Sequence, residues 1–318
     1  MSSQSQSENV LIGVIGGSGL YHLDHLTVLH TVNPLTPWGY PSSPITVASL
    51  PSGTRIAFLA RHGIGHTISP SAVPNPANIA ALKSLGVKAI IAFSAVGSLR
   101  EEISPGSFVL PTQVIDRTKG IRQSSFFDGT TIVAHAMFGD PFSSKLIEWL
   151  VPRIEKALEP SSPDEPPKKL FTDKTAVCME GPQFSTRAES LLYRQWGADI
   201  INMSVLPESK LAREAELSYA IVAMATDYDC WRPHGESVTA HSVLDVLHNN
   251  SATAKNVLSA ILDDLQETLQ KEGEEGAEAI LLQEKGGMKF SIMPRSAKQD
   301  PNDRKKLAYV LPEYFGDD

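Results

Sequence analysis

Short apolar runs that end abruptly in small or polar residues recur along this chain, and they constrain its fold more than any other feature. Residues 10–15, 87–93 and 217–225 are such runs, and they lead into Gly16, Ser94 and Thr226, respectively. An apolar run of this length bounded by turn-forming residues is typical of a buried strand that opens into a loop. Residues 55–60 are a further strand of this kind.

Helical patterns separate these strands. The expected helices cover residues 76–85, 143–158, 186–196, 207–216 and about 242–271. Strands that alternate with helices predict an α/β fold, here one domain with a mixed, mostly parallel central sheet flanked by helices. Ligands of such sheets collect at the carboxyl ends of the strands, where the loops described above would lie.

The expected domain covers residues 10–294. Residues 1–9 are rich in Ser and Gln and predict a disordered lead, and residues 159–170 are interrupted by prolines and predict a surface loop. We expect residues 295–318 to form a mobile C-terminal tail. Apolar residues at 309–315 leave open the alternative that this tail docks on a neighbouring molecule.

Composition excludes several classes of protein. The net charge of −8 and the lack of a long Lys/Arg stripe argue against a nucleic-acid partner, and no apolar run is long enough to span a bilayer. Cys178 and Cys230 form no C-x-x-C pair, so a thiolate metal site is not supported. We expect a cytoplasmic protein without membrane contacts, and a nuclear location stays open.

Several strand-end loops carry groups that suit an oxyanion. These are Ser18, Arg61, His62, Ser94, Ala95 and Ser204, which offer hydroxyls, backbone N–H groups and one fixed positive charge. Each alone could be an ordinary loop residue. His62 and His66 have a spacing that could bind a metal, but Gly63 and Gly65 disrupt the helix that such a site requires, so we expect no metal.

Asp227 and Asp229 follow a third strand end. In an extended loop both carboxyls can face the same side, and burial there would keep a proton on one of them. Such a group can donate to a leaving heteroaromatic nitrogen. The alternative is a solvated turn. Phe184 could stack on a base, or it could equally be a core residue.

Six motifs, taken in chain order, carry a resemblance to a known family. They are GVIGGSGL, ARHGIGH, SAVGSLREEISPG, EGPQFSTRAES, WGADIINMSVLPE and AMATDYDCW. In this order and with this spacing they resemble the trimeric purine nucleoside phosphorylase family, and within it the methylthioadenosine-cleaving members. The resemblance extends from about residue 10 to residue 294.

The resemblance implies roles for most of these residues. It places Ser18, Arg61, His62, Ser94, Ala95 and Ser204 at the phosphate, Phe184 beside the base, Met203 against the ribose, and Asp227 and Asp229 at the purine. The implied reaction is reversible phosphorolysis of S-methyl-5′-thioadenosine to adenine and S-methyl-5-thio-α-D-ribose 1-phosphate, in methionine and purine salvage. We expect Asp227 to bond or protonate N7, with Asp229 in support or in exchanged roles. No cofactor is implied, since inorganic phosphate is a co-substrate.

Specificity depends on fewer residues. Ser185 and Asp227 stand where 6-oxopurine enzymes of this fold have Glu and Asn, which favours adenine because an aspartate accepts from a 6-amino group. Ala240 and Leu244 suit an apolar 5′-methylthio group, although a shift of one residue would place His241 there. His135 matches a position that neighbouring subunits contribute, which implies a homotrimer. Rival functions are a purine nucleoside phosphorylase of broader or 6-oxopurine specificity, a hydrolytic nucleosidase with Glu208 as its base, and a nucleoside-binding sensor that has lost catalysis.

Overall fold

The fold is built on one mixed sheet. The structure is a computed structural model that describes residues 10–17, 26–160, 167–232, 240–273, 276–295 and 298–316. The side chains of residues 240–245 and 247–251 are not described. The predicted leader and Ser18 lie outside the described residues, as does half of the 159–170 loop, namely residues 161–166. The strands are β1 (Ile12–Gly16), β2 (Thr27–Val32), β3 (Ile45–Ser49), β4 (Arg55–Ala60), β5 (Ala89–Ser98), β6 (Phe108–Asp116), β7 (Leu170–Cys178), β8 (Ile200–Asn202) and β9 (Ser218–Asp227).

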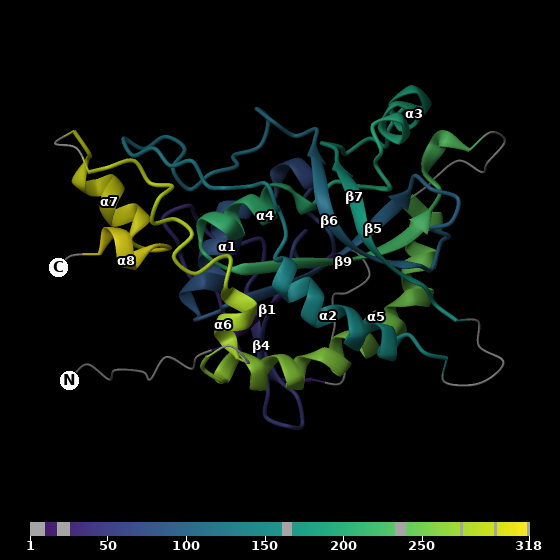
Figure 1. Cartoon of the computed structure of the whole chain (residues 1–318), viewed down its shortest axis with the longest axis horizontal. Coiled ribbons are helices and arrows are strands. Elements are labelled where there is room, and N and C mark those ends of the chain that lie inside the picture. The colour runs from purple at the N-terminus through teal and green to yellow at the C-terminus, as the bar shows by residue number, and fades with distance from the viewer. Residues whose placement is uncertain are drawn as a thin grey trace.

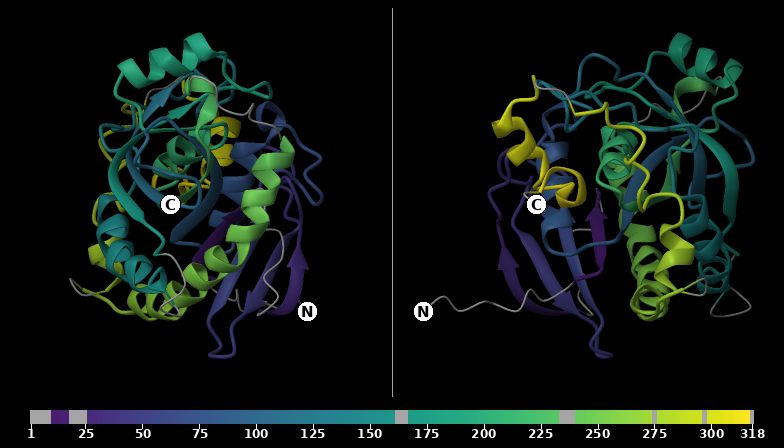
Figure 2. Two further views of the ribbon diagram at one scale, coloured as in Figure 1. Left: turned by 90° about the vertical axis from the view of Figure 1, so that its right-hand side faces the viewer. Right: turned by 60° about the vertical axis from the view of Figure 1, so that its left-hand side comes forward.

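The sheet closes on itself at one end. Its order is β2-β3-β4-β1-β5-β8-β7-β6-β9, and β9 also pairs with β5, so the last five strands form a ring. The pairs β1–β4, β1–β5, β5–β9, β6–β7 and β7–β8 are parallel. Figure 2 shows the first strands, in purple and blue, continuing the sheet to one side of the ring. The predicted α/β class with a mixed sheet is confirmed.

Buried apolar runs explain the central strands. Every residue of β1 is buried, and β5 and β9 are buried along nearly their whole length. Such continuous runs are typical of strands that are covered on both faces. By contrast, β2 is an edge strand whose residues are mostly exposed.

Helices pack around this sheet (Figure 1). They are α1 (Asn75–Ser84), α2 (Ser144–Ala157), α3 (Arg187–Gln195), α4 (Val205–Glu214), α5 (Ala240–Gln270), α6 (Ala277–Leu281), α7 (Pro301–Leu307) and α8 (Pro312–Phe315), with short 3₁₀ turns at Pro70–Ala72 and Asp229–Trp231. The predicted helices agree with α1 to α5, within two residues at most ends. A capping box between Thr186 and Glu189 fixes the start of α3. Among the described helices, none is long and apolar enough to cross a membrane.

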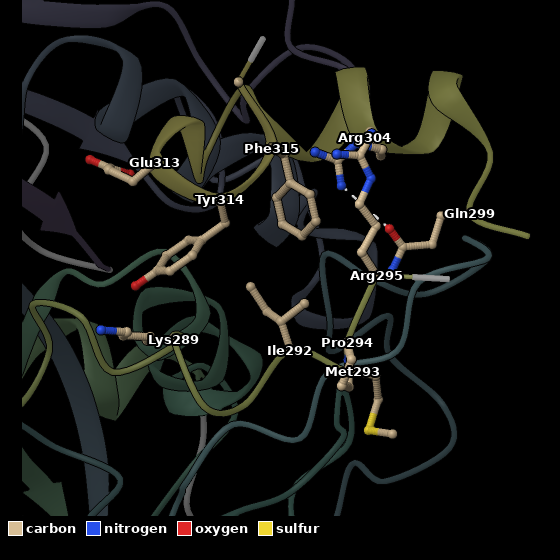
Figure 3. A pocket seen from close by; sticks show the side chains of 11 residues that line it. Lys289, Ile292, Met293, Pro294, Arg295, Gln299, Arg304, Glu313, Tyr314 and Phe315 are labelled. Atoms are coloured by element: carbon tan, nitrogen blue, oxygen red, sulfur yellow. Dashed lines mark hydrogen bonds between the residues drawn. The ribbon is translucent and has the colours of Figure 1, made fainter. Parts of the chain in front are cut away.

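The C-terminal segment differs from the mobile tail that the sequence predicts. Helices α7 and α8 lie at one end of the molecule (Figure 1) and bury Leu307, Val310, Leu311 and Phe315 against their own chain. Val310, Leu311 and Phe315 belong to the apolar residues for which the sequence leaves docking on a neighbouring molecule open, and here they pack within the same chain. A cavity of about 420 Å³ lies beside these helices. The Phe315 ring and Ile292 line it, and Arg304 donates to Gln299 at its side (Figure 3).

Candidate active site

A cavity of about 840 Å³ opens where β4, β5, β8 and β9 end. Most of the residues singled out from the sequence line it. These are Arg61, His62, Ser94, Ala95, Phe184, Met203, Ser204, Asp227 and Asp229. Residues that are far apart in the chain therefore meet in one place, as expected for the carboxyl ends of neighbouring strands.

Arg61 follows the last residue of β4 and is almost fully buried. Its Nε donates to Glu208 Oε1, its Nη2 donates to Glu208 Oε2 at 3.0 Å, and its Nη1 donates to the Phe93 carbonyl at 2.8 Å. This bidentate pair fixes the plane of the guanidinium. A methyl group at Gly17 would lie 2.8 Å from Arg61 Nη1, so the Gly-rich turn after β1 can approach the guanidinium only because it has no side chain there.

His62 is neutral in this site. Burial, with a further contribution from the Arg61 charge, lowers the pKa of His62 to about 4. Its Nδ1 lies 2.9 Å from the Ile68 carbonyl, which can only accept, so Nδ1 carries the proton. Nε2 is therefore an acceptor, suited to a protonated phosphate oxygen. The His66 ring stacks on His62 at 4.4 Å between centroids.

Ser94 and Ser204 converge from different strands. Their hydroxyl oxygens lie 2.9 Å apart, although the residues are 110 positions apart in sequence. Ser94 lies in β5, and Ser204 is the N-cap residue of α4, where its side chain makes no capping bond. Both hydroxyls thus lie beside Arg61 and His62 in a cavity whose polar groups suit a small oxyanion.

The two aspartates form a turn and not the extended loop that the sequence suggested. The Asp229 backbone N–H donates to Asp227 Oδ1 at 2.8 Å, and Thr226 Oγ1 donates to Asp227 Oδ2 at 2.8 Å. Asp229 has a φ of 43°, in the left-handed region that Asp tolerates better than most residues. Burial raises the pKa of both carboxyls. Asp229 Oδ2 is buried and has no hydrogen-bond partner among the described residues.

The base and ribose candidates have different surroundings. Phe184 lines the cavity and is 47% exposed, which fits a surface that a ligand would cover. Met203 also lines the cavity, and its sulfur contacts the position that a side chain at Gly181 would occupy. Ser185 does not line it, and its hydroxyl donates to Met179 Sδ at 3.2 Å.

Of the residues expected at the 5′ end of the substrate, only His135 has a described side chain. Ala240 and Leu244 lie in the first turns of α5, and their side chains, like that of His241, are outside the described residues. His135 is exposed and does not line this cavity. Its backbone N–H donates to the Ser291 carbonyl at 2.8 Å, which places it on a loop paired with residues 291–293.

Sequence reasoning missed Arg122. Its buried guanidinium donates to the carbonyls of Met203 and Leu206 at 2.7 Å, to the Glu180 carbonyl at 2.7 Å, and to Glu180 Oε2 at 3.0 Å. It thereby ties the segment that leads to Phe184 to the segment that carries Met203. No sequence motif around Arg122 indicates this role, because most of its partners are backbone carbonyls, which every residue has.

The sequence matches the profile of the phosphorylase superfamily over residues 11–263. The chain belongs to this superfamily. This phosphorylase is 71% identical to a protein of Coprinopsis cinerea named S-methyl-5′-thioadenosine phosphorylase, over 98% of each chain. It is 56% identical to a protein of the same name from Schizosaccharomyces pombe, over 83% of this chain and 85% of that one.

Solved structures agree with the sequence comparison. The phosphorylase resembles a methylthioadenosine phosphorylase from an Antarctic soil metagenomic library, with a TM-score of 0.82 and 39% identity over 96% of this chain and 99% of that one. It also resembles methylthioadenosine phosphorylase from Schistosoma mansoni in complex with adenine, with a TM-score of 0.79 and 32% identity over 89% of this chain and 99% of that one.

Proposed function

We propose that this phosphorylase cleaves S-methyl-5′-thioadenosine reversibly with inorganic phosphate, giving adenine and S-methyl-5-thio-α-D-ribose 1-phosphate. One observation carries the proposal: an anion-binding set, with Arg61, His62, Ser94 and Ser204, shares a single cavity with the buried carboxyls of the Asp pair. Highly similar proteins bear the name of this activity. The enzyme is thus a pentosyltransferase.

The two halves of the site suit the two charges of the reaction. Cleavage of the N-glycosidic bond develops oxocarbenium character on the sugar and negative charge on the departing purine. Phosphate is already a nucleophile, so Arg61 and the serine hydroxyls need only position it near C1′. Asp227, whose pKa is raised by burial, can hold a proton for purine N7.

Adenine is the favoured base because Asp227 and Asp229 present carboxyl oxygens. An oxygen acceptor suits the 6-amino group of adenine, whereas the 6-oxo group of hypoxanthine needs a donor. Ser185, whose hydroxyl donates to Met179, adds no further carboxylate to this pair. The apolar 5′ pocket that we assign to Ala240 and Leu244 is consistent with the names of the relatives.

A phosphate requirement tests this function. We expect adenine release from S-methyl-5′-thioadenosine to depend on added phosphate, and inosine to be a much poorer substrate. Equal release with and without phosphate would identify a hydrolytic nucleosidase instead. Glu208 is a poor base for that rival reaction, because both of its oxygens are bonded to Arg61.

The same proposal includes a homotrimer in which His135 reaches the 5′ end of a neighbour's cavity. Val133, Met137, Phe290 and Met293 are each at least half exposed and surround His135 along two paired segments. Apolar side chains exposed together favour a protein interface. Light scattering should give three times the chain mass, and Phe290→Asp should lower that mass.

A further inference from the structure

Asn202 has the clearest unexplained polar group in the cavity. It is the last residue of β8, only 6% of it is exposed, and it lines the cavity. Its Oδ1 and its Nδ2 are both buried, and neither has a hydrogen-bond partner among the described residues. A buried carboxamide without partners is costly, so such a group in a cavity indicates a ligand that completes it.

The backbone around Asn202 is held firmly. β8 pairs with β7 in the register Asn202 to Cys178, and the Asn202 carbonyl accepts from the Met179 N–H at 2.9 Å. Arg122 bonds the carbonyl of the next residue, Met203, at 2.7 Å. The carboxamide is therefore fixed in place before a ligand arrives, as specific recognition requires.

Neighbouring strands place Asn202 relative to the Asp pair. Gly97 on β5 pairs with Asp227 on one side and with Ile201 on the other. A methyl group at Gly97 would lie 3.1 Å from Asp227 Oδ1 and 3.0 Å from Ile201 Cγ2. Ile201 thus lies across β5 from Asp227, and Asn202 follows it at the end of β8, directly before Met203, where all four residues line the cavity.

We propose that Asn202 is a base-contacting residue that binds the N3 edge of the purine, with Nδ2 donating to N3. This inference rests on the proposed function, in which Asp227 and Asp229 take the N7 and 6-amino side. N3 flanks the glycosidic bond on the side opposite N7, next to the sugar that Met203 contacts. The sugar 2′-hydroxyl lies beside N3 in a nucleoside, so Oδ1 accepts from it and one ligand satisfies both orphaned atoms.

A substrate lacking N3 tests the contact. The experiment measures kcat/KM at saturating phosphate for S-methyl-5′-thioadenosine and its 3-deaza analogue, with the wild type and Asn202→Ala. We expect the wild type to lose roughly tenfold to a hundredfold on the 3-deaza analogue, and Asn202→Ala to lose a similar factor on the natural substrate. The variant should then discriminate less than about threefold between the two substrates.

Two further variants distinguish a contact between Asn202 and the purine from a purely structural role of Asn202. Asn202→Asp should be worse than Asn202→Ala, because a carboxylate only accepts and faces the lone pair of N3. Ser209→Ala is the control: it removes a different buried polar group, a hydroxyl without a described partner outside the cavity lining, and it should leave the kinetics unchanged. The ligand-free Asn202→Ala protein should melt no lower than the wild type, because the orphaned carboxamide makes no hydrogen bond to lose.

Each other outcome overturns the proposal. Equal losses by Asn202→Ala on both substrates, or a lower melting temperature, would show a structural role. If Asn202→Ala instead fails to discriminate between the natural substrate and its 1-deaza analogue, while still discriminating against the 3-deaza analogue, the contact is with N1. If the wild type releases no adenine with phosphate, the proposed function fails instead, and binding of adenine and 3-deazaadenine to both proteins still tests the contact.

Discussion

Glu208 bonds the Nε and Nη2 of Arg61 through its two carboxylate oxygens, in a pair that is closed to solvent at the edge of the cavity. Tyr219 donates a further bond to Glu208 Oε2 at 2.7 Å. The orientation of the cation that we assign to phosphate is therefore set by a residue that does not line the cavity.

Glu208→Gln should raise the KM for phosphate roughly tenfold or more, with a smaller effect on the nucleoside KM, because an amide cannot accept both guanidinium bonds. Loss of the buried charge partner should also cost about 3–5 kcal/mol of unfolding free energy. Steady-state rates against phosphate concentration check the first effect, and denaturant unfolding checks the second. Tyr219→Phe, which removes one bond to Glu208 and leaves Arg61 paired, is the milder control. An unchanged phosphate KM would contradict the assignment.

Ionisation of Asp227 should make kcat/KM fall at high pH, which is the basic limb of the pH profile. Burial raises the pKa of this carboxyl above its usual range, so the proton that it holds for N7 is present at low pH and is lost as the pH rises through the raised value. We expect kcat/KM to fall on that side. Asp227→Asn cannot titrate, so it should remove this limb, lower kcat/KM for the adenine nucleoside roughly 10²- to 10⁴-fold, and favour inosine.

Asp229→Asn is the matched control for this pH profile. The pKa of Asp229 is also raised by burial, but its backbone N–H bonds Asp227, and the amide variant preserves that contact. The control should keep the basic limb. If Asp229→Asn loses the limb and Asp227→Asn keeps it, the two residues have exchanged roles.

The sequence predicted which residues meet in the cavity better than it predicted the hydrogen bonds between them. Arg61 follows β4 and Asp227 ends β9, and parallel strands bring such ends together. The strand expected to end at residue 93 continues to Ser98, so Ser94 lies within β5. The turn at Asp229 depends on one backbone bond that no pattern encodes. Glu208 could be named from the sequence, but only the fold shows that its partner is Arg61.

Some strands were missed because their patterns are weak. β6 contains Pro111, which argues against a regular strand, and its pairing with β7 is irregular around that residue. β7 carries Lys and Asp among its apolar residues and follows a proline-rich loop. The C-terminal tail was expected to be mobile because residues 294–306 are polar and charged, and within α7 only Leu307 is buried.

Leu311 tests the packed C-terminal segment. Its side chain is fully buried in the main apolar core, so Leu311→Ala should lower the unfolding free energy by about 2–5 kcal/mol. Lys305→Ala, on an exposed position of α7, should change it by less than about 0.5 kcal/mol. Thermal or denaturant unfolding of the two variants measures the difference. Equal stabilities would mean that the segment is a mobile tail after all.

Arg122 should act as a positioning residue for the nucleoside. Its guanidinium joins the carbonyls of Glu180, Met203 and Leu206, and a lysine ammonium at the same place cannot span these directions. Arg122→Lys should therefore raise the nucleoside KM roughly tenfold to a hundredfold, because the segments bearing Phe184 and Met203 separate.

The phosphate KM is the readout that distinguishes positioning from general damage by Arg122→Lys. Arg61 and Ser94 lie outside the segments that Arg122 bonds, so the phosphate KM should change less than the nucleoside KM. Arg153→Lys, which alters a partly exposed arginine paired with Asp264, should leave both constants unchanged. Equal increases in both KM values, or lower stability with normal kinetics, would show that Arg122 only supports the fold. A selective rise in the nucleoside KM would show that one buried guanidinium aligns the base and ribose sides of the cavity.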